Sequence, residues 1–515
     1  GYAALTTNTT AEVNTAIGFS AMKLNTTGGT NTAVGANALY SNTTASDNVA
    51  VGSSALLANT TGTENVAAGQ GALDANTTAS NNTAVGRMAL SANTTGASNT
   101  GLGHQALIGS TTGANNTAVG KDALASNTTA SYNTAVGMNA LSTTISSTAQ
   151  TAVGYNALRL ATGHYNTALG YEALGSNSGG TENVAVGANA ASSTTSGILN
   201  VSMGSHAFLD NTTGDNNTSI GSYALSNNTT ADNNTAIGKS ALLANTTGSE
   251  NTAVGLNSLY SNTEAANNVG IGHSALEGNT TGASNTAVGK NALVANTTAS
   301  QNVAVGQAAL GANTTGTRNN AFGFGAADAT TTAIDVSAFG TNALGANTTG
   351  NQNAAFGTNA LVLNTTGSSN TAMGHFALEA STGSYNTAVG RDAGLSVTTG
   401  VNNTLIGGLA GDAITTGSSN TFVGYALNRS AAGVDNELLF GSAINGGGTN
   451  TVRLGTSAGN ATLNLDGSDT SWAAASDERL KKDVADSTVG LSFINALRPV
   501  TFKWNAKNAI ADTLP

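Results

Sequence analysis

The stretch Asn31-Thr32-Ala33-Val34-Gly35 decides the fold, because it recurs along most of the 515-residue chain. Its glycine returns every 17 residues, apart from two steps of 16 residues that end at Gly170 and Gly390. The consensus unit reads Asn-Thr-Ala-Val-Gly-x-x-Ala-Leu-x-x-Asn-Thr-Thr-Gly/Ala-x-x and runs from Gly1 to Gly424. Repetition at a short fixed period predicts one stacked repeat architecture instead of several globular domains.

Two positions of the unit are almost invariant. The third residue after the glycine is Ala in 24 of the 25 units from Gly1 to Gly407, the exception being Ser258. The fourth residue before the glycine is Asn except at Gln150 and Val336. A 17-residue unit cannot bury its own apolar residues, so each position is expected to meet its own copies in the neighbouring units. We therefore expect a thin core of Ala, Val and Leu, with Asn side chains bonded into a ladder along the axis.

The alternative of a helix at x-x-Ala-Leu-x-x fails on length, because only about six residues separate the glycine from the next Asn. Thr-Ala-Val suits a strand and Asn-Thr-Thr-Gly suits a turn. Both 16-residue steps lose their residue in that turn, where the chain can absorb a deletion without reversing the strand faces. The position after Thr-Thr is often Gly and often Ala, so no left-handed backbone is assigned to it. The prediction is an all-β parallel β-solenoid, or β-roll, with 17-residue coils and a length on the order of 120 Å.

Composition excludes several classes of protein. Charged residues make up 8% of the chain and the net charge is −11, which disfavours a nucleic-acid partner. The absence of cysteine excludes disulfides, thiolate metal sites and a cysteine nucleophile. No run of 18 apolar residues is present, so no membrane insertion is expected. Nothing in the sequence calls for a cofactor.

The repeat weakens after residue 424, and the composition changes again near residue 472. Both Trp and both Pro of the chain lie beyond residue 471, as do many of its charged residues. We divide the chain into a solenoid (1–424), a transition of degenerate repeats (425–471) and a C-terminal segment (472–515).

That C-terminal segment resembles a known family. Residues 476–484 read Ser-Asp-Glu-Arg-Leu-Lys-Lys-Asp-Val, and residues 497–504 read Leu-Arg-Pro-Val-Thr-Phe-Lys-Trp. Together they resemble the start of the intramolecular chaperone of phage tail fibres and tailspikes, the S74 peptidase family. The resemblance implies the beginning of a small α+β domain that ends before the family's domain is complete. The repeats are similar to those of tail-fibre proteins and, more loosely, to the left-handed β-rolls of trimeric adhesin heads.

The resemblance also implies a homotrimer and a single self-cleavage. Carried over to this chain, the cleaved bond is Ser476–Asp477, with Ser476 as nucleophile and Lys481 as base. A desolvated lysine with a lowered pKa can serve as the base for a serine hydroxyl. The competing interpretation is that Ser476 caps a helix whose first turn carries Asp477.

Other residues give weaker signals. The five histidines occupy variable positions of separate units, so no metal site is expected. Sparse acidic residues argue against a glycan-cleaving tailspike, which needs paired carboxylates. An ice-binding solenoid is a remote alternative, because the paired threonines fall in a turn.

The hypothesis that remains is an extracellular binding rod with no turnover beyond the self-cleavage. Its most direct form is a homotrimeric phage tail fibre that attaches to a glycan or protein receptor on the host. A bacterial or archaeal surface adhesin is the alternative. No receptor-binding residue is assigned, but the variable positions after each glycine are the natural candidates: Arg87, Lys121, Tyr155, Tyr171, His273 and Lys290.

Overall fold

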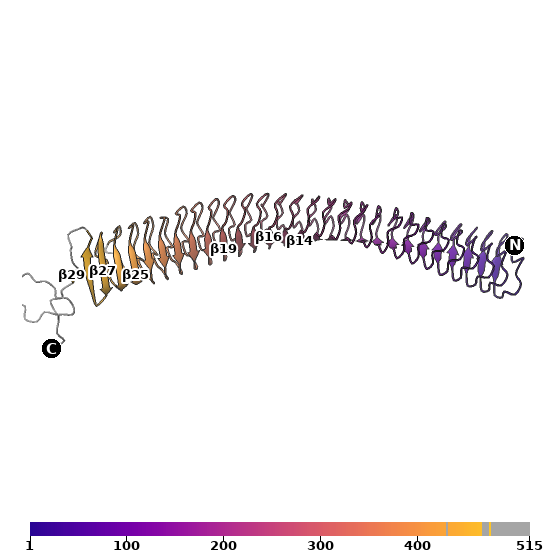
Figure 1. Cartoon of the computed structure of the whole chain (residues 1–515), viewed down its shortest axis with the longest axis horizontal. Helices are drawn as coiled ribbons and strands as arrows, with labels where there is room; N and C mark the ends of the chain where they lie inside the picture. The colour runs from indigo at the N-terminus through magenta and orange to yellow at the C-terminus, as the bar shows by residue number, and fades with distance from the viewer. Residues whose placement is uncertain (429–430, 466–472, 475–515) are drawn as a thin grey trace, which may run out of the picture.

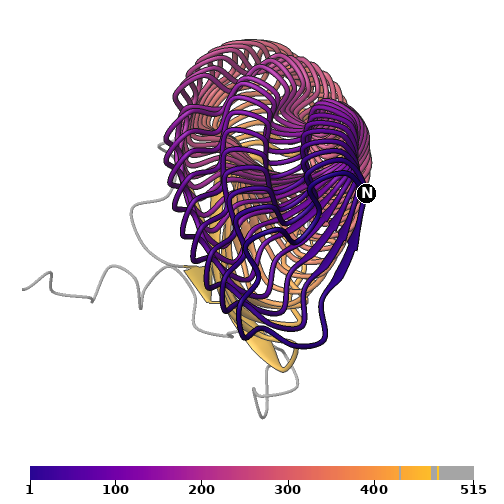
Figure 2. The same cartoon turned by 90° about the vertical axis from the view of Figure 1, so that its right-hand side faces the viewer.

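A computed structural model describes residues 1–428, 431–465 and 473–474. The described chain is all β-strand and turn, and it forms a long, gently curved rod (Figure 1). The strands lie side by side along the axis, and the end-on view shows the coils stacked on one another (Figure 2). The prediction of a parallel β-solenoid with 17-residue coils is confirmed.

Each coil contributes one short strand to a single continuous sheet. The strands are β1 (Thr15–Ile17), β2 (Thr32–Val34), β3 (Val49–Val51), β4 (Val66–Ala68), β5 (Thr83–Val85), β6 (Thr100–Leu102), β7 (Thr117–Val119), β8 (Thr134–Val136), β9 (Thr151–Val153), β10 (Thr167–Leu169), β11 (Val184–Val186), β12 (Val201–Met203), β13 (Thr218–Ile220), β14 (Thr235–Ile237), β15 (Thr252–Val254), β16 (Val269–Ile271), β17 (Thr286–Val288), β18 (Val303–Val305), β19 (Asn320–Phe322), β20 (Ser337–Phe339), β21 (Ala354–Phe356), β22 (Thr371–Met373), β23 (Thr387–Val389), β24 (Thr404–Ile406), β25 (Thr421–Tyr425), β26 (Leu438–Ser442), β27 (Thr451–Thr456), β28 (Gly459–Asn464) and β29 (Ala473–Ala474).

The register between coils pairs equivalent positions of the repeat. Thr32 pairs with Val49 and Ala33 with Ala50, each 17 residues apart. At the first short step, Thr151 pairs with Thr167, 16 residues away, so the strands stay aligned. The missing residue is therefore absorbed in the turn, as the sequence predicts. Parallel pairing continues through β27, and β28 then returns antiparallel.

The core differs from the predicted one in one respect. The middle strand residue and the Ala-Leu pair of the following turn are fully buried, for example Ala33, Ala38 and Leu39. The last strand residue was also expected in the core, but Val51 is 42% exposed and Ile17 is 59% exposed. The expectation is wrong because strand side chains alternate, so burying the middle residue turns both outer residues outward.

Buried asparagine side chains occupy much of the rest of the interior and form two hydrogen-bonded ladders along the axis. In the turn ladder, Asn42 Nδ2 donates to Asn25 Oδ1 at 2.7 Å and to the carbonyl of Ala45 at 2.9 Å. In the strand ladder, Asn48 Nδ2 donates to the Gly62 carbonyl, and the Asn48 backbone N–H donates to Asn31 Oδ1. Both sets of side chains are fully buried. The predicted asparagine ladder is thus confirmed, and most coils contribute to two such ladders, although residues such as Ser110 and Ala161 interrupt the turn ladder.

Exceptions to the consensus are compensated locally. Gln150 keeps the ladder, since its Nε2 donates to the Gly163 carbonyl at 2.8 Å. Ser258, which replaces Ala at its position of the repeat, donates to the Gly270 carbonyl at 2.7 Å. Gly270 replaces the usual strand Ala, and a Cβ there would lie 2.6 Å from the Ser258 hydroxyl. An added oxygen in one coil is therefore matched by a removed methyl group in the next.

The backbone conformation and the close contact between coils explain why the repeat glycine is constant. Gly120 has φ of 135°, a conformation that side-chain-bearing residues rarely adopt. A Cβ at Gly120 would also lie 2.6 Å from the carbonyl oxygen of Gly137 in the next coil. The glycine therefore allows adjacent coils to approach closely at the end of each strand.

We expect Asn245→Ala to destabilise the coils around it by about 2–3 kcal/mol, because two buried acceptors lose their donor. Asn245 Nδ2 donates to Asn228 Oδ1 at 3.0 Å and to the Gly248 carbonyl at 2.9 Å. Hydrogen exchange of amides in the flanking coils measures the effect, since stability in a repeat array is local. Thr247→Ala in the same turn removes only an exposed side chain and is the matched control. Equal protection in the two variants would contradict a structural role for the ladder.

Candidate functional site

The residues directly after the repeat glycines are exposed in most coils. All six candidates in this position (Arg87, Lys121, Tyr155, Tyr171, His273 and Lys290) are exposed. They are spread over many coils, so the structure does not gather them into one site. His273 and Lys290 stand on adjacent coils, as do Tyr155 and Tyr171, whose rings stack at a centroid distance of 5.4 Å. This pair forms an exposed aromatic platform.

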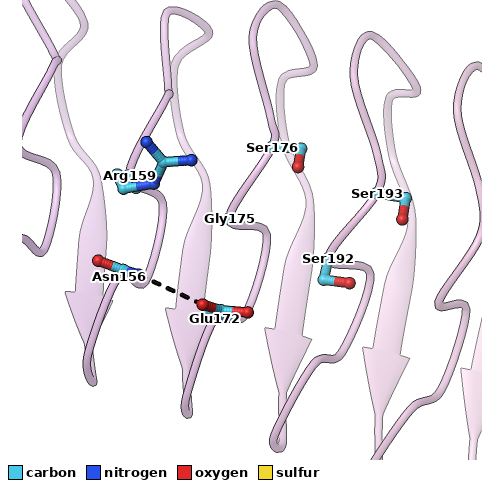
Figure 3. A pocket seen from close by; sticks show the side chains of 7 residues that line it. All are labelled: Asn156, Arg159, Glu172, Gly175, Ser176, Ser192 and Ser193. Atoms are coloured by element: carbon cyan, nitrogen blue, oxygen red, sulfur yellow. Dashed lines mark hydrogen bonds between the residues drawn. The ribbon is translucent and has the colours of Figure 1, made fainter.

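A small polar pocket lies on the same coils as the platform. Its volume is about 150 Å³. Figure 3 shows its lining residues, which come from the turns of three successive coils: Asn156, Arg159, Glu172, Gly175, Ser176, Ser192 and Ser193. The pocket exists because Gly175 has no side chain at a position where the coil before it carries Arg159. Ser192, at the same position of the following coil, is short.

Hydrogen bonds and charge organise the pocket. Asn139 Nδ2 donates to Asn156 Oδ1 at 3.2 Å, and Asn156 Nδ2 donates to Glu172 Oε1 at 3.3 Å. The ion pairs in the described part of the chain are Lys121–Asp122, Arg318–Asp335 and Arg391–Asp392. Arg159 therefore lines the pocket without an ion-pair partner among the described residues. Its guanidinium and the serine hydroxyls offer donors to a polar ligand.

The negative charge of Glu172 affects the pKa of Tyr171 in the aromatic platform. It is the largest cause that raises the pKa of Tyr171, and partial desolvation and a hydrogen bond to Glu172 act in the same direction. The phenol of Tyr171 therefore stays protonated and can act as a hydrogen-bond donor over the whole neutral range. Sequence reasoning proposed the two tyrosines but missed the pocket beside them. A glycine at position 175, where most other coils carry side chains, was the available signal.

The other interpretations of the sequence can be placed on the structure. The first threonine of many Asn-Thr-Thr turns is half-buried and bonded to the next coil, as where Thr43 Oγ1 donates to the Thr60 carbonyl. The second threonine is exposed in these turns, as at Thr44 and Thr61. Burial raises the pKa of the Asp74 and Asp328 carboxyls, but these two residues lie many coils apart. Within residues 1–428 and 431–465, no three His, Asp or Glu side chains gather into a metal-binding group.

The proposed self-cleavage residues Ser476, Asp477 and Lys481 lie outside the described residues. Their roles remain predictions from the sequence. The domain boundaries near residues 424 and 472 likewise remain predictions.

Comparison with known proteins places the C-terminal segment in a family. Residues 476–513 match the family described as chaperone of endosialidase, peptidase S74. A search of curated proteins finds no match. Among the described residues, no helix is long and apolar enough to cross a membrane.

The solenoid and the matched segment together define a class. A β-solenoid of about 26 turns followed in the sequence by a segment that matches the S74 family is consistent with a phage tail-fibre-like protein. The resemblance recognised in the sequence is confirmed at this level.

We expect Glu172→Gln to lower the pKa of Tyr171 toward its ordinary value of about 10, because the main charge that raises it is removed. Titration of tyrosine ring signals by NMR measures the change. Glu250→Gln, another exposed carboxylate of the rod, should leave the Tyr171 titration unchanged. An unaltered pKa in Glu172→Gln would show that the platform and the pocket are electrostatically independent.

Proposed function

We propose that this chain forms the shaft and receptor-binding surface of an extracellular trimeric fibre, a phage tail fibre that attaches to its host. One observation carries the proposal: an unbroken β-solenoid leads toward an S74 chaperone segment at residues 476–513. A rod with one buried residue pattern repeated in every coil suits a spacer, because its stiffness comes from continuous stacking. Function is then binding without turnover, apart from the single self-cleavage.

The proposed receptor contact is the Tyr155–Tyr171 platform with the pocket beside it. Aromatic faces pack against the apolar face of a sugar ring, while hydroxyl groups need hydrogen-bond partners nearby. The pocket offers Arg159 and two serines as donors and Glu172 as acceptor, within a volume of about 150 Å³. These features favour a cell-surface glycan over an apolar ligand. Several copies of the chain in one fibre would multiply a weak contact through avidity.

We expect Tyr155→Ala with Tyr171→Ala to reduce binding of the purified fibre to host-type surface glycans by about tenfold or more, because stacking is lost in every chain at once. A glycan array or binding to intact cells measures the loss. Tyr132→Ala, which removes an exposed tyrosine from a different position of its coil, is the control. Undiminished binding by the double variant would place the receptor contact elsewhere on the rod.

The chaperone segment is proposed to release itself by cleavage of the Ser476–Asp477 bond, with Ser476 as nucleophile and Lys481 as base. We expect incubation of the chain in its assembled form to yield a fragment that ends at Ser476, detected by intact mass. Ser476→Ala and Lys481→Ala should abolish that fragment, whereas Lys482→Ala should retain it. A fragment that ends at the same position in Ser476→Ala would rule out the assigned nucleophile.

A further inference from the structure

The outward face of the sheet carries an uncharged stripe along the whole rod, made of a row of mostly threonine residues beside a row of apolar residues. It consists of the first and last residues of each strand from β1 to β26. The first residue is Thr in most strands, and the last is Val, Ile, Leu, Met, Phe or Ala in the three-residue strands. The larger residues protrude, since Leu102 and Met373 are each 45% exposed. Phe322, Phe339 and Phe356 stack on one another in this stripe at centroid distances of 4.7 and 4.8 Å.

The stripe contains no charge. None of the strands from β1 to β26 contains Asp, Glu, Lys or Arg, although charged residues occur at other positions of the same coils. A solvated surface has no reason to exclude charge over so many repeats, whereas the centre of a protein interface does. With about 26 coils, the exposed apolar area is on the order of 1,000 Å², comparable with what each partner buries in a stable interface.

The two borders of the stripe carry opposite charge. The exposed residue directly after each glycine is the basic border, and no Asp or Glu occupies this position in any coil: its charged members are Arg87, Lys121, Lys239, Lys290 and Arg391. The residue two positions before each strand is the acidic border: its charged members are Asp47, Glu64, Glu182, Glu250 and Asp335, with Arg318 as the single base. Arg318 is already paired with Asp335. Lys121 and Arg391 also pair with the aspartates that follow them, which leaves Arg87, Lys239 and Lys290 outside the three ion pairs.

This asymmetry distinguishes the possible directions of packing. When two such faces pack parallel, the basic border of one chain lies beside the acidic border of the other. When they pack antiparallel, like borders meet and repel. The charge pattern therefore favours parallel packing. In a parallel arrangement of two identical chains, each coil faces the equivalent coil of the other chain. Bulky residues such as the phenylalanine stack then face their own copies.

We propose that this stripe is the surface along which copies of this chain pack, parallel and in register, with their sheets facing inward. The inference rests on the proposed fibre function for the presence of several chains, and it adds the face, the direction and the register. A second copy is the partner that the observations favour, because only a rod with the same rung spacing can cover an uncharged stripe of this length. An ice surface is less suited, since the last strand residue varies from Ala68 to Phe339 and breaks a regular array.

Single-cysteine variants test the proposal, because the chain has no cysteine of its own. Val119→Cys places the thiol on the stripe in β7, well away from the middle of the rod. In a parallel, in-register assembly, oxidation should join two Val119→Cys chains into a covalent dimer, at least tenfold faster than for the control. The control is Thr112→Cys, an exposed position in the turn that precedes this strand. A mixture of Val119→Cys and Val288→Cys chains should give no mixed disulfide.

Three results would overturn the proposal. Faster cross-linking of the Thr112→Cys variant than of the Val119→Cys variant would place the interface on another face while leaving a multi-chain fibre intact. Mixed disulfides between Val119→Cys and Val288→Cys chains would show a shifted or antiparallel register. A monomer at micromolar concentration that halts ice growth would assign the stripe to ice instead. Conversely, efficient cross-linking of the Val119→Cys variant in a fibre that binds no cells would keep the interface and remove the attachment function.

A second measurement does not depend on disulfide geometry. Val119→Lys together with Val254→Lys puts two charges on the stripe and should shift the assembly toward smaller species by light scattering. Thr112→Lys with Thr247→Lys puts the same charges on the exposed turns and should leave the mass unchanged. Unchanged mass in the stripe variant would contradict the proposal.

Discussion

The close axial approach of one coil to the next is the constraint on which the rest of the molecule depends. At the end of each strand, the carbonyl of the following coil lies where a Cβ would stand, as at Gly120. Buried amides hold the same spacing in the turn and before the strand, as Asn42 and Asn48 illustrate. Small core residues follow from this spacing, because a rung of 17 residues leaves room for little more than Ala and Leu inside.

The sequence predicted the period, the strand, the turn and the asparagine ladder, because each depends on residue identity at a fixed place. It did not predict the direction of Val51 and its equivalents, since a strand that reads Thr-Ala-Val is compatible with burial of either face. It also missed the left-handed backbone of buried residues such as Leu39, whose φ is 49°. Glycine usually marks this conformation, and here stacking imposes it on leucine in nearly every coil.

The candidate sites also combine features that could be predicted from the sequence with features that could not. Exposure of Tyr155 and Tyr171 followed from their variable position in the repeat, and their contact followed from the period. The pocket beside them arises from the absence of a side chain at Gly175, which matters only once the neighbouring coils are placed around it. Charge segregation at the borders of the stripe was present in the sequence, but its meaning required knowing which strand residues face outward.

The two short coils show that this chain tolerates a change in one turn without disturbing its neighbours, because Thr151 and Thr167 remain aligned. Whole coils are therefore interchangeable parts. A gene built from such units can gain or lose them by unequal recombination, and the reach of the protein would then change in increments of about 4.8 Å. Selection could therefore adjust the length of the rod without a new fold.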